Sequence, residues 1–327
     1  MMNLRGGIDL GGTKIQAVVV DEAHGVLGED RQPTPTSGGP ADVAAAMAAA
    51  LTAAAAAAGV ETAALSGVGV GSPGEIDVAR GMVTQARNLP DWEGSYPLGP
   101  ELAKLVGAPV RLGNDVNVAT DAEAELGAGS EFSSMLGVFW GTGVGGGIVL
   151  DDKLWEGRGA GGELGHVVVR IGGRHCPCGR RGCLEAYAGR GSMEARARRL
   201  AGDGRDTKLF QLMEKHGRDR LTSGIWSRAL DRDDALAREI VTEAVEALGA
   251  GVASAVNLLD VEAVIVGGGL GVRLGEPYRE HIEAAMLPHL FSDDNPPAVR
   301  LAALGDLGGA IGAALLVLPG RGGPLDG

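Results

Sequence analysis

Apolar residues along this chain occur in short runs that end in glycine turns. In segment 8–21, the arm Ile8 to Leu10 precedes Gly11 and Gly12, and a β-branched arm follows them. This pattern predicts a pair of antiparallel strands joined by a glycine hairpin. Segments 68–74 and 263–269 are further apolar runs that end in glycine loops, and they predict buried strands.

The first hairpin pattern has a second copy near the middle of the chain. Segment 139–151 matches the first segment at a fixed offset of 130, which pairs Gly11 with Gly141 and 18–21 with 148–151. Segments 109–115 and 298–306 also resemble each other, as a strand, a short loop and the start of a helix. These matches predict an internal duplication that gives two related α/β lobes.

Two stretches have the composition of long helices. Residues 41–58 are rich in alanine, carry Val43, Met47 and Leu51 at helical spacing, and stop at Gly59. We expect a packed helix here, because alanine has the strongest helix propensity. Residues 231–257 predict a second long helix, whereas the polar and irregular stretch 200–231 predicts only short ones.

Length and charge narrow the class of protein. The 327 residues allow two domains of ordinary size, and 45% hydrophobic residues is a normal globular content. A net charge of −13 argues against nucleic-acid binding, because phosphate backbones are bound by clustered Lys and Arg. An acidic protein can still hold a phosphorylated small molecule through backbone N–H groups and Mg²⁺. We expect no membrane span and no secretory signal in residues 1–7, and therefore a cytoplasmic protein.

All three cysteines lie in one short window, Cys176, Cys178 and Cys183, and His166 precedes them. Three thiolates and one imidazole supply the four ligands of a closed, structural Zn²⁺ site. The alternatives are three reduced cysteines, or one disulfide with a leftover thiol. The odd count and the expected reducing compartment favour the metal. Glu163 and Glu185 flank the cluster, so the metal would direct two acids and a histidine at one place.

The glycine hairpins are candidate phosphate-binding loops, because glycines let backbone N–H groups approach a phosphate. One glycine hairpin alone is usually only a turn, but the equivalent second loop suggests that two hairpins hold a triphosphate. Asp9 would then be an anionic partner for Mg²⁺. The loop after the strand at 263–267 is a candidate for contact with the nucleotide ring and ribose, or simply a helix-entry turn. The phosphate- and nucleotide-binding candidates are Asp9, Gly11, Gly12, Thr13, Lys14, Gly141, Thr142, Gly143, Gly267, Gly268 and Gly269.

Asn114 and Asp115 lie between a predicted strand and a predicted helix. Asn and Asp commonly cap helices at this position. The functional alternative is that Asp115 accepts the proton of a substrate hydroxyl during phosphoryl transfer, and either side chain can cap while the other does chemistry.

The motifs together resemble one family. Asp9-x-Gly-Gly-Thr-Lys14, Pro73-Gly74, Asn88-Leu89, Asn114-Asp115-x-Asn117, Gly141-Thr142-Gly143-x-Gly145, Glu163-x-x-His166 and Cys176-x-Cys178-Gly-x-x-Gly-Cys183-x-Glu185 occur in the order found in the ROK family (repressors, open reading frames, kinases). The resemblance covers nearly the whole chain. Its cysteine block is highly specific, whereas the glycine hairpin alone indicates only the wider group of sugar kinases, heat-shock ATPases and actin.

The resemblance implies a fold and an organisation. We expect an α/β protein with two ribonuclease-H-like (actin-like ATPase) lobes and a cleft between them. The smaller lobe is expected at 1–117, completed by a C-terminal helix at about 306–319. The larger lobe, which carries the zinc site, is expected at 118–305.

The resemblance also implies roles for residues. Asp115 is expected to be the catalytic base for the sugar 6-hydroxyl, with Mg²⁺ bound alongside ATP. One ring nitrogen of His166 is expected on zinc and the other toward the sugar, so that the metal supports the sugar site without touching the phosphate. The expected sugar-binding residues are Gly74, Asn88, Asn114, Asp115, Glu163, His166 and Glu185.

The implied activity is ATP-dependent phosphorylation of glucose to glucose 6-phosphate, a glucokinase of glycolysis, acting as a homodimer or homotetramer. N-acetylglucosamine and N-acetylmannosamine kinases are similar in these motifs. Polyphosphate as donor would require a basic track, and none is evident near Lys14 or Lys153. A repressor is not expected, since a strand near Leu4 leaves no room for a preceding DNA-binding domain. Asp9 and Asp115 together argue against a non-catalytic sugar sensor.

Overall fold

The computed structural model describes residues 3–86 and 89–318, and these form two compact units. The first contains 3–127 and 303–318, and the second contains 128–302. The boundary expected at 117/118 falls inside helix α3 (Asp115–Leu126). The structure instead keeps α3 whole within the first unit, because this helix packs along α11 (Gly308–Leu315) from the C-terminal segment.

The first unit is built on a five-stranded mixed sheet. Its strands are β1 (Arg5–Leu10), β2 (Lys14–Val20), β3 (Val26–Pro33), β4 (Val68–Ser72) and β8 (Val110–Asn114), in the order β3-β2-β1-β4-β8. Strands β1, β4 and β8 are parallel, with Asp9 opposite Gly71 and Ser72 opposite Asn114. The carboxyl ends of these three strands therefore meet at one edge of the sheet.

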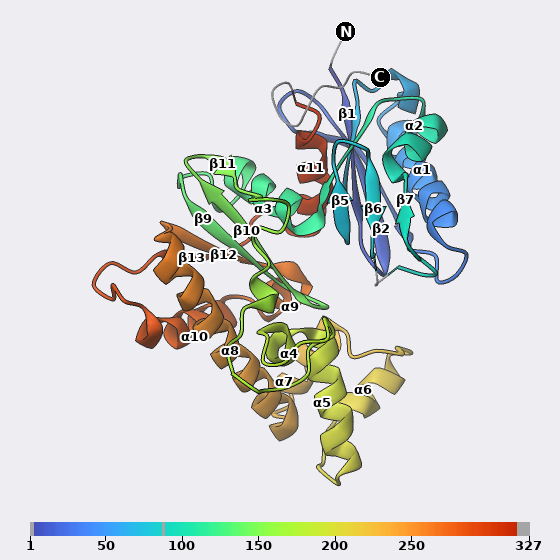
Figure 1. The fold of residues 1–327 in the computed structure, drawn as a ribbon. Coiled ribbons are helices and arrows are strands. Elements are labelled where there is room, and N and C mark those ends of the chain that lie inside the picture. Colours follow the sequence, from blue (N-terminus) through green and yellow to red (C-terminus); the bar gives the residue numbers. More distant parts are fainter. Residues whose placement is uncertain (1–2, 87–88, 319–327) are drawn as a thin grey trace. The chain divides into compact units, whose positions relative to one another are not determined.

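Helices cover both faces of this sheet. Its helical elements are α1 (Pro40–Ala57), η1 (Thr62–Ala64), α2 (Leu98–Val106), α3, η4 (Gly305–Leu307) and α11. Side chains alternate along β1, so Gly6 faces Leu51 of α1, whereas a Cβ at Gly7 would lie 2.0 Å from the Ala310 carbonyl oxygen of α11. The missing side chain at Gly7 lets α11 lie directly on the strand. Figure 1 shows the red C-terminal helix beside the blue strands.

Helix α1 is long and apolar enough to cross a membrane by length and composition, with a mean hydropathy of 1.4 over 18 residues. One such helix is weak evidence for a membrane span. Core helices of soluble proteins meet the same criterion, and 44% of the window is buried. Val43, Met47 and Leu51 are fully buried and pack in the core of the first unit, which confirms the predicted packed helix.

A small antiparallel sheet completes the first unit. It consists of β5 (Glu75–Asp77), β6 (Met82–Thr84) and β7 (Ser95–Tyr96). It follows the end of β4 directly, so the Gly74 loop is fixed between the main sheet and this small one.

The second unit repeats the topology of the first. Its strands are β9 (Met135–Trp140), β10 (Val144–Leu150), β11 (Lys153–Leu154), β12 (Ala263–Gly267) and β13 (Ala298–Leu301), in the order β11-β10-β9-β12-β13. Strands β9 and β10 begin and end 130 residues after β1 and β2, and the pattern of parallel and antiparallel neighbours is the same. The predicted duplication and the ribonuclease-H-like order are confirmed.

The rest of the second unit is mainly helical. Its helical elements are η2 (Leu164–His166), α4 (Glu185–Ala188), α5 (Arg190–Gly202), α6 (Leu209–Lys215), α7 (Ser223–Leu230), α8 (Ala235–Leu259), α9 (Gly268–Leu274), α10 (Glu276–Met286) and η3 (Leu287–His289). The predicted long helix is α8, whose N-cap Asp234 accepts a hydrogen bond from the Ala237 N–H at 2.8 Å. Short helices α6 and α7 occupy the stretch where only short helices were expected.

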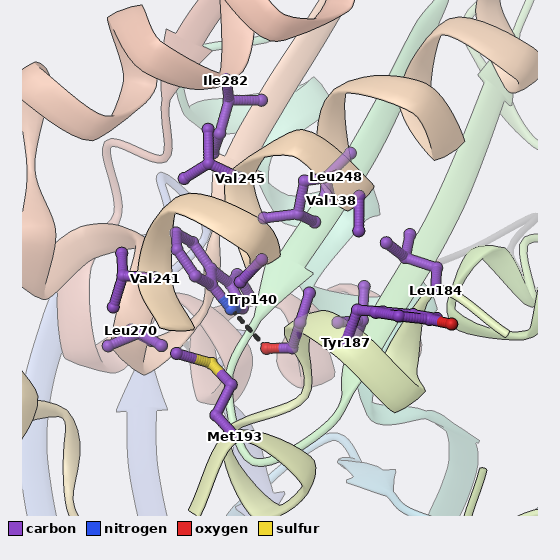
Figure 2. Packing of buried hydrophobic residues seen from close by; sticks show 14 of the residues in the cluster. Val138, Trp140, Leu184, Tyr187, Met193, Val241, Val245, Leu248, Leu270 and Ile282 are labelled. Carbon is purple, nitrogen blue, oxygen red and sulfur yellow. Dashed lines mark hydrogen bonds between the residues drawn. The ribbon is translucent and has the colours of Figure 1, made fainter. Parts of the chain in front are cut away.

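Trp140 anchors the end of β9 in the core of the second unit. Its ring is fully buried near Val241, Leu270 and Met193 (Figure 2). The indole N–H donates to the Ala188 carbonyl at 2.7 Å, drawn as a dashed line in Figure 2. The strand is thereby tied to α4 immediately before the second glycine hairpin begins.

Candidate functional site

The first glycine hairpin connects β1 and β2 and is closed by a bond from the Gly11 N–H to the Lys14 carbonyl at 2.9 Å. Thr34 braces it from beyond the end of β3. The Thr34 hydroxyl donates to the Gly11 carbonyl at 2.6 Å, and its N–H donates to the Thr13 carbonyl at 3.3 Å. Thr34 is buried, so the shape of the loop is set before any ligand arrives. No motif in the sequence indicated Thr34.

Charged groups surround this hairpin. Lys14 forms an ion pair with Asp306 at 3.6 Å, and Arg31 approaches the same carboxylate at 3.7 Å. Asp9 lies against the start of α11, where a Cβ at Gly309 would be 2.9 Å from its carboxyl carbon. Burial raises the pKa of Asp9, with Lys14 opposing the rise and Asp306 adding to it. A cation beside Asp9 would remove the cost of its buried charge.

Asn114 and Asp115 lie where β8 passes into α3, and both accept hydrogen bonds from the start of the helix. Asn114 is the N-cap of α3, and its Oδ1 accepts from the N–H groups of Val116 and Asn117 at 3.0 and 3.2 Å. Asp115 is the first residue of the helix, and one carboxylate oxygen accepts from the Val116 N–H at 3.0 Å. The carboxylate therefore lies at the positive, N-terminal end of the helix dipole.

Gly74 lies just after the end of β4, near the same edge as Asp115. Its φ of 98° is a left-handed conformation that favours glycine, and a Cβ would lie 2.7 Å from the Thr84 carbonyl oxygen. Any other residue at this position would therefore strain the loop and clash with the backbone of the small sheet. Asn88, the other sugar-binding candidate in this region, lies outside the described residues.

The second hairpin connects β9 and β10 and is held by the start of α5. The Gly141 N–H donates to the Gly143 carbonyl at 3.0 Å. The N–H groups of Arg190 and Gly191 donate to the carbonyls of Gly141 and Thr142, both at 3.1 Å. Backbone N–H groups at the start of α5 thus satisfy the hairpin carbonyls.

Glu185 connects this hairpin to the cysteine cluster. One carboxylate oxygen accepts from the Val144 N–H at 3.0 Å, and the other lies 3.9 Å from the Cys176 sulfur. A Cβ at Gly143 would lie 2.2 Å from the Glu185 carboxylate, so a side chain at this position would displace that carboxylate. The sequence placed Glu185 beside the metal, but it gave no indication of the bond to Val144.

Gly267, Gly268 and Gly269 form the turn from β12 into α9. Gly268 has a φ of 79°, and a Cβ there would lie 2.6 Å from the Trp140 carbonyl oxygen. The helix-entry role alone therefore explains this glycine. Gly269 faces Ser223, whose hydroxyl would lie 3.7 Å from a Cβ at that position. Ser223 offers a polar group beside bare backbone, and the sequence did not single it out.

His166, Cys176, Cys178 and Cys183 converge, with one ligand atom from each lying within 4.8 Å of all the others. The Cys178 and Cys183 sulfurs are 3.8 Å apart, and the cysteines are free, which excludes a disulfide between them. Tetrahedral zinc with Zn–S bonds of about 2.3 Å places two sulfurs about 3.8 Å apart, so the donor set fits this metal. Burial raises the pKa of the Cys176 thiol to about 12, a cost that a bound cation would remove.

The two nitrogens of His166 face different partners. Nδ1 lies 3.8 Å from the Cys176 sulfur, and Nε2 lies 3.7 Å from the carboxylate of Glu163. The Glu163 side chain is 63% exposed, so it is open to a ligand from solvent. The histidine can therefore bind a metal through one nitrogen while the other points to the neighbouring acid.

The candidate residues fall into two groups that follow the division of the chain. The first unit holds Asp9, Gly11, Gly12, Thr13, Lys14, Gly74, Asn114 and Asp115 at the carboxyl ends of its parallel strands and the adjoining hairpin. The second unit holds the second hairpin, the Gly267 turn, the cysteine cluster and its two flanking acids. Each group is rich in backbone donors, carboxylates and small residues, which is suited to binding phosphates and sugar hydroxyls.

The chain is similar to known sugar kinases over nearly its whole length. It is 35% identical over 318 residues to the glucokinase of Thermotoga maritima, covering 95% of this chain and 96% of that protein. It is 30% identical to the N-acetyl-D-glucosamine kinase of Escherichia coli, covering 95% and 98%. The crystal structure of a ROK family glucokinase from Streptomyces griseus in complex with glucose and AMPPNP matches with a TM-score of 0.81 at 33% identity, covering 96% and 98%.

These neighbours share the actin-like ATPase fold, which confirms the fold expected from the sequence motifs. The family model for the ROK family matches residues 5–319. The chain therefore belongs to the ROK family.

Proposed function

We propose that this protein is an ATP-dependent glucokinase that transfers the γ-phosphoryl group of ATP to the 6-hydroxyl of glucose. The observation that carries this proposal is the match, along nearly the whole chain, to a glucokinase whose structure contains glucose and an ATP analogue. The geometry of each unit agrees with it: a carboxylate stands at a helix start in the first unit, and glycine hairpins occur in both.

In the proposed reaction, the Asp115 carboxylate accepts the proton of the sugar 6-hydroxyl. The hydroxyl oxygen forms a bond to the γ-phosphorus as the bond from that phosphorus to the β-phosphate oxygen breaks, and ADP leaves. Asn114 satisfies two helix N–H groups, so the Asp115 carboxylate need not serve as the main cap. Backbone N–H groups of the two hairpins and Lys14 stabilise the phosphate charge, and Asp9 is the anionic partner of the cation in Mg-ATP.

Glu163, His166 and Glu185 are the proposed ligands of the sugar hydroxyls, together with Asn88, Asn114 and the backbone at Gly74. The donor set of His166 and the three cysteines fits Zn²⁺, which would supply a rigid, closed tetrahedral centre and no catalytic water. His166 then keeps Nε2 and Glu163 directed at the sugar. Removal of the metal would free the histidine ring to rotate.

Glucose is preferred to acetamido sugars in this proposal because the glucokinases matched are more similar to this chain than the N-acetyl-D-glucosamine kinase. We further propose that the protein acts in the cytoplasm as a homodimer or homotetramer. Gel filtration with light scattering tests the assembly state.

The catalytic proposal is tested by measuring ADP release from Mg-ATP, with glucose, N-acetylglucosamine, N-acetylmannosamine and mannose offered separately. We expect turnover with glucose, and we expect Asp115→Asn to lower kcat by a factor of about 10² or more while calorimetric glucose affinity is retained. Glu125→Gln is the matched control, since Glu125 is exposed on the same helix. Near-normal turnover in Asp115→Asn would remove the general base. Preference for an acetamido sugar would change only the substrate.

A further inference from the structure

The two glycine hairpins differ in one respect that matters for phosphate binding. The first carries Lys14, whereas the offset of 130 places Val144 at the matching position of the second. Val144 is buried. The second hairpin therefore has backbone N–H groups and the Thr142 hydroxyl, but no cation of its own.

Arg190 supplies a cation to this hairpin from the start of α5. Its guanidinium donates to the Thr142 hydroxyl oxygen at 2.7 Å. A guanidinium has only donors, whereas a hydroxyl has one donor and two acceptor lone pairs. The contact therefore makes the Thr142 oxygen an acceptor toward Arg190, and the hydroxyl proton is left to donate to another group.

The charges around Arg190 favour an anion. Burial lowers the pKa of Arg190, the positive charge of Arg220 lowers it further, and Glu194 opposes these effects. Glu194 is already engaged by Arg198 at 2.8 Å, by Arg220 at 3.1 Å and by the Leu221 N–H at 3.0 Å. Within the described part of the chain, no carboxylate forms an ion pair with Arg190. A negatively charged ligand beside Thr142 would relieve this excess of positive charge.

We propose that Arg190 is a positioning residue for the phosphoryl donor: it holds the Thr142 hydroxyl ready to donate to a phosphate oxygen and adds positive charge to the hairpin that lacks a lysine. This inference rests on the proposed kinase function and names a residue that no motif in the sequence indicates. The ligand class is the polyphosphate chain of a nucleoside triphosphate. Arg190 acts through Thr142, so the two side chains are expected to behave as one unit.

The test is a double-mutant cycle with Arg190→Met, Thr142→Val and both together, measured as kcat/KM for Mg-ATP at saturating glucose. We expect each single change to lower kcat/KM about 10- to 100-fold, the range for a charge-assisted hydrogen bond. The double variant should lose little more than either single variant. Thr142→Ser keeps the hydroxyl and should retain activity. Arg238→Met is the matched control, since Arg238 is a surface arginine paired with Asp233.

Glucose affinity and thermal midpoint distinguish positioning from a structural role, and both should be unchanged in Arg190→Met. A kcat/KM for Arg190→Met within about twofold of wild type would overturn the inference. Fully additive effects of Arg190→Met and Thr142→Val in the double variant would also overturn it. A fall in both glucose affinity and thermal stability of Arg190→Met would indicate a structural role instead. Calorimetric binding of AMPPNP separates this inference from the kinase proposal. If wild type phosphorylates no sugar but binds AMPPNP more tightly than Arg190→Met does, the function fails and the role of Arg190 stands. Equal AMPPNP affinity in the two proteins overturns that role.

Discussion

Two buried tryptophans of the second unit form a matched pair for measuring one hydrogen bond. Trp140 and Trp226 are both fully buried in the same core cluster. The Trp140 N–H donates to the Ala188 carbonyl at 2.7 Å, whereas the buried Trp226 N–H has no hydrogen-bond partner among the described residues. Replacing each tryptophan by phenylalanine removes the same atoms and differs only in what happens to the N–H group.

The expected difference follows from these contacts. Each substitution leaves a similar small cavity that costs about 1 kcal/mol. Trp140→Phe also breaks a buried hydrogen bond and leaves the Ala188 carbonyl short of a donor, which adds about 2 kcal/mol. Trp226→Phe instead removes a buried unsatisfied donor, which recovers about 1 kcal/mol. We therefore expect Trp140→Phe to destabilise the second unit by about 3 kcal/mol and Trp226→Phe to be nearly neutral.

Differential scanning calorimetry of the ligand-free variants measures this difference. A chain of two units can unfold in two separate transitions. Both variants must therefore be compared in the transition of the second unit, which contains both tryptophans. For a unit of this size, about 3 kcal/mol corresponds to a midpoint difference of about 6 to 12 °C. Equal midpoints for the two variants would refute the reasoning, since the cavity is common to both. A larger fall for Trp226→Phe would do the same.

Three further predictions concern packing, pH and metal. Gly69→Ala should destabilise the first unit strongly, because its Cβ would lie 1.7 Å from the Ala313 carbonyl oxygen. Gly202→Ala is the control: its Cβ would meet no atom within 4 Å, so this variant should be as stable as wild type or more stable. Urea denaturation measures both changes. Burial raises the pKa of Glu194, but hydrogen bonds from two arginines and a backbone N–H outweigh burial and hold that pKa below its ordinary value of 4.5. The ionised form thus contributes stability above the unfolded pKa, and this contribution is lost as pH falls through the folded pKa. Glu194→Gln should be less stable than wild type at pH 7, and thermal melts should show this difference shrinking as the pH falls below 4.5 and through the folded pKa. Chelation should release about one zinc per chain and weaken glucose binding measured by calorimetry; a metal-free protein with normal glucose affinity would contradict the supporting role of the cluster.

Local patterns made much of the fold predictable. The glycine turns, the offset of 130 and the alanine-rich helix are features of short segments, so periodicity and composition were enough to find them. The cysteine cluster was also predictable, because Cys176, Cys178 and Cys183 are close in sequence and their spacing restricts what they can bind.

Other contacts join distant segments and leave no pattern in the sequence. Thr34 braces a hairpin more than twenty residues away, and Arg190 reaches Thr142 across an entire inserted segment. The end of the first unit was misplaced because α3 is held by α11, and that partner lies near the other end of the chain. Such contacts depend on packing in three dimensions, which propensity and spacing do not encode.

Position 143 shows how the two hairpins differ in what they contact. It corresponds to Thr13 in the first hairpin, yet a Cβ at 143 would lie 2.2 Å from the Glu185 carboxylate. A side chain at 143 would therefore push this carboxylate away from the Val144 N–H. Because Glu185 also lies beside Cys176, a change at position 143 would reach the cysteine cluster through one side chain. The second hairpin and the cysteine cluster are thus mechanically connected, whereas the first hairpin lies in a unit that contains no cysteine.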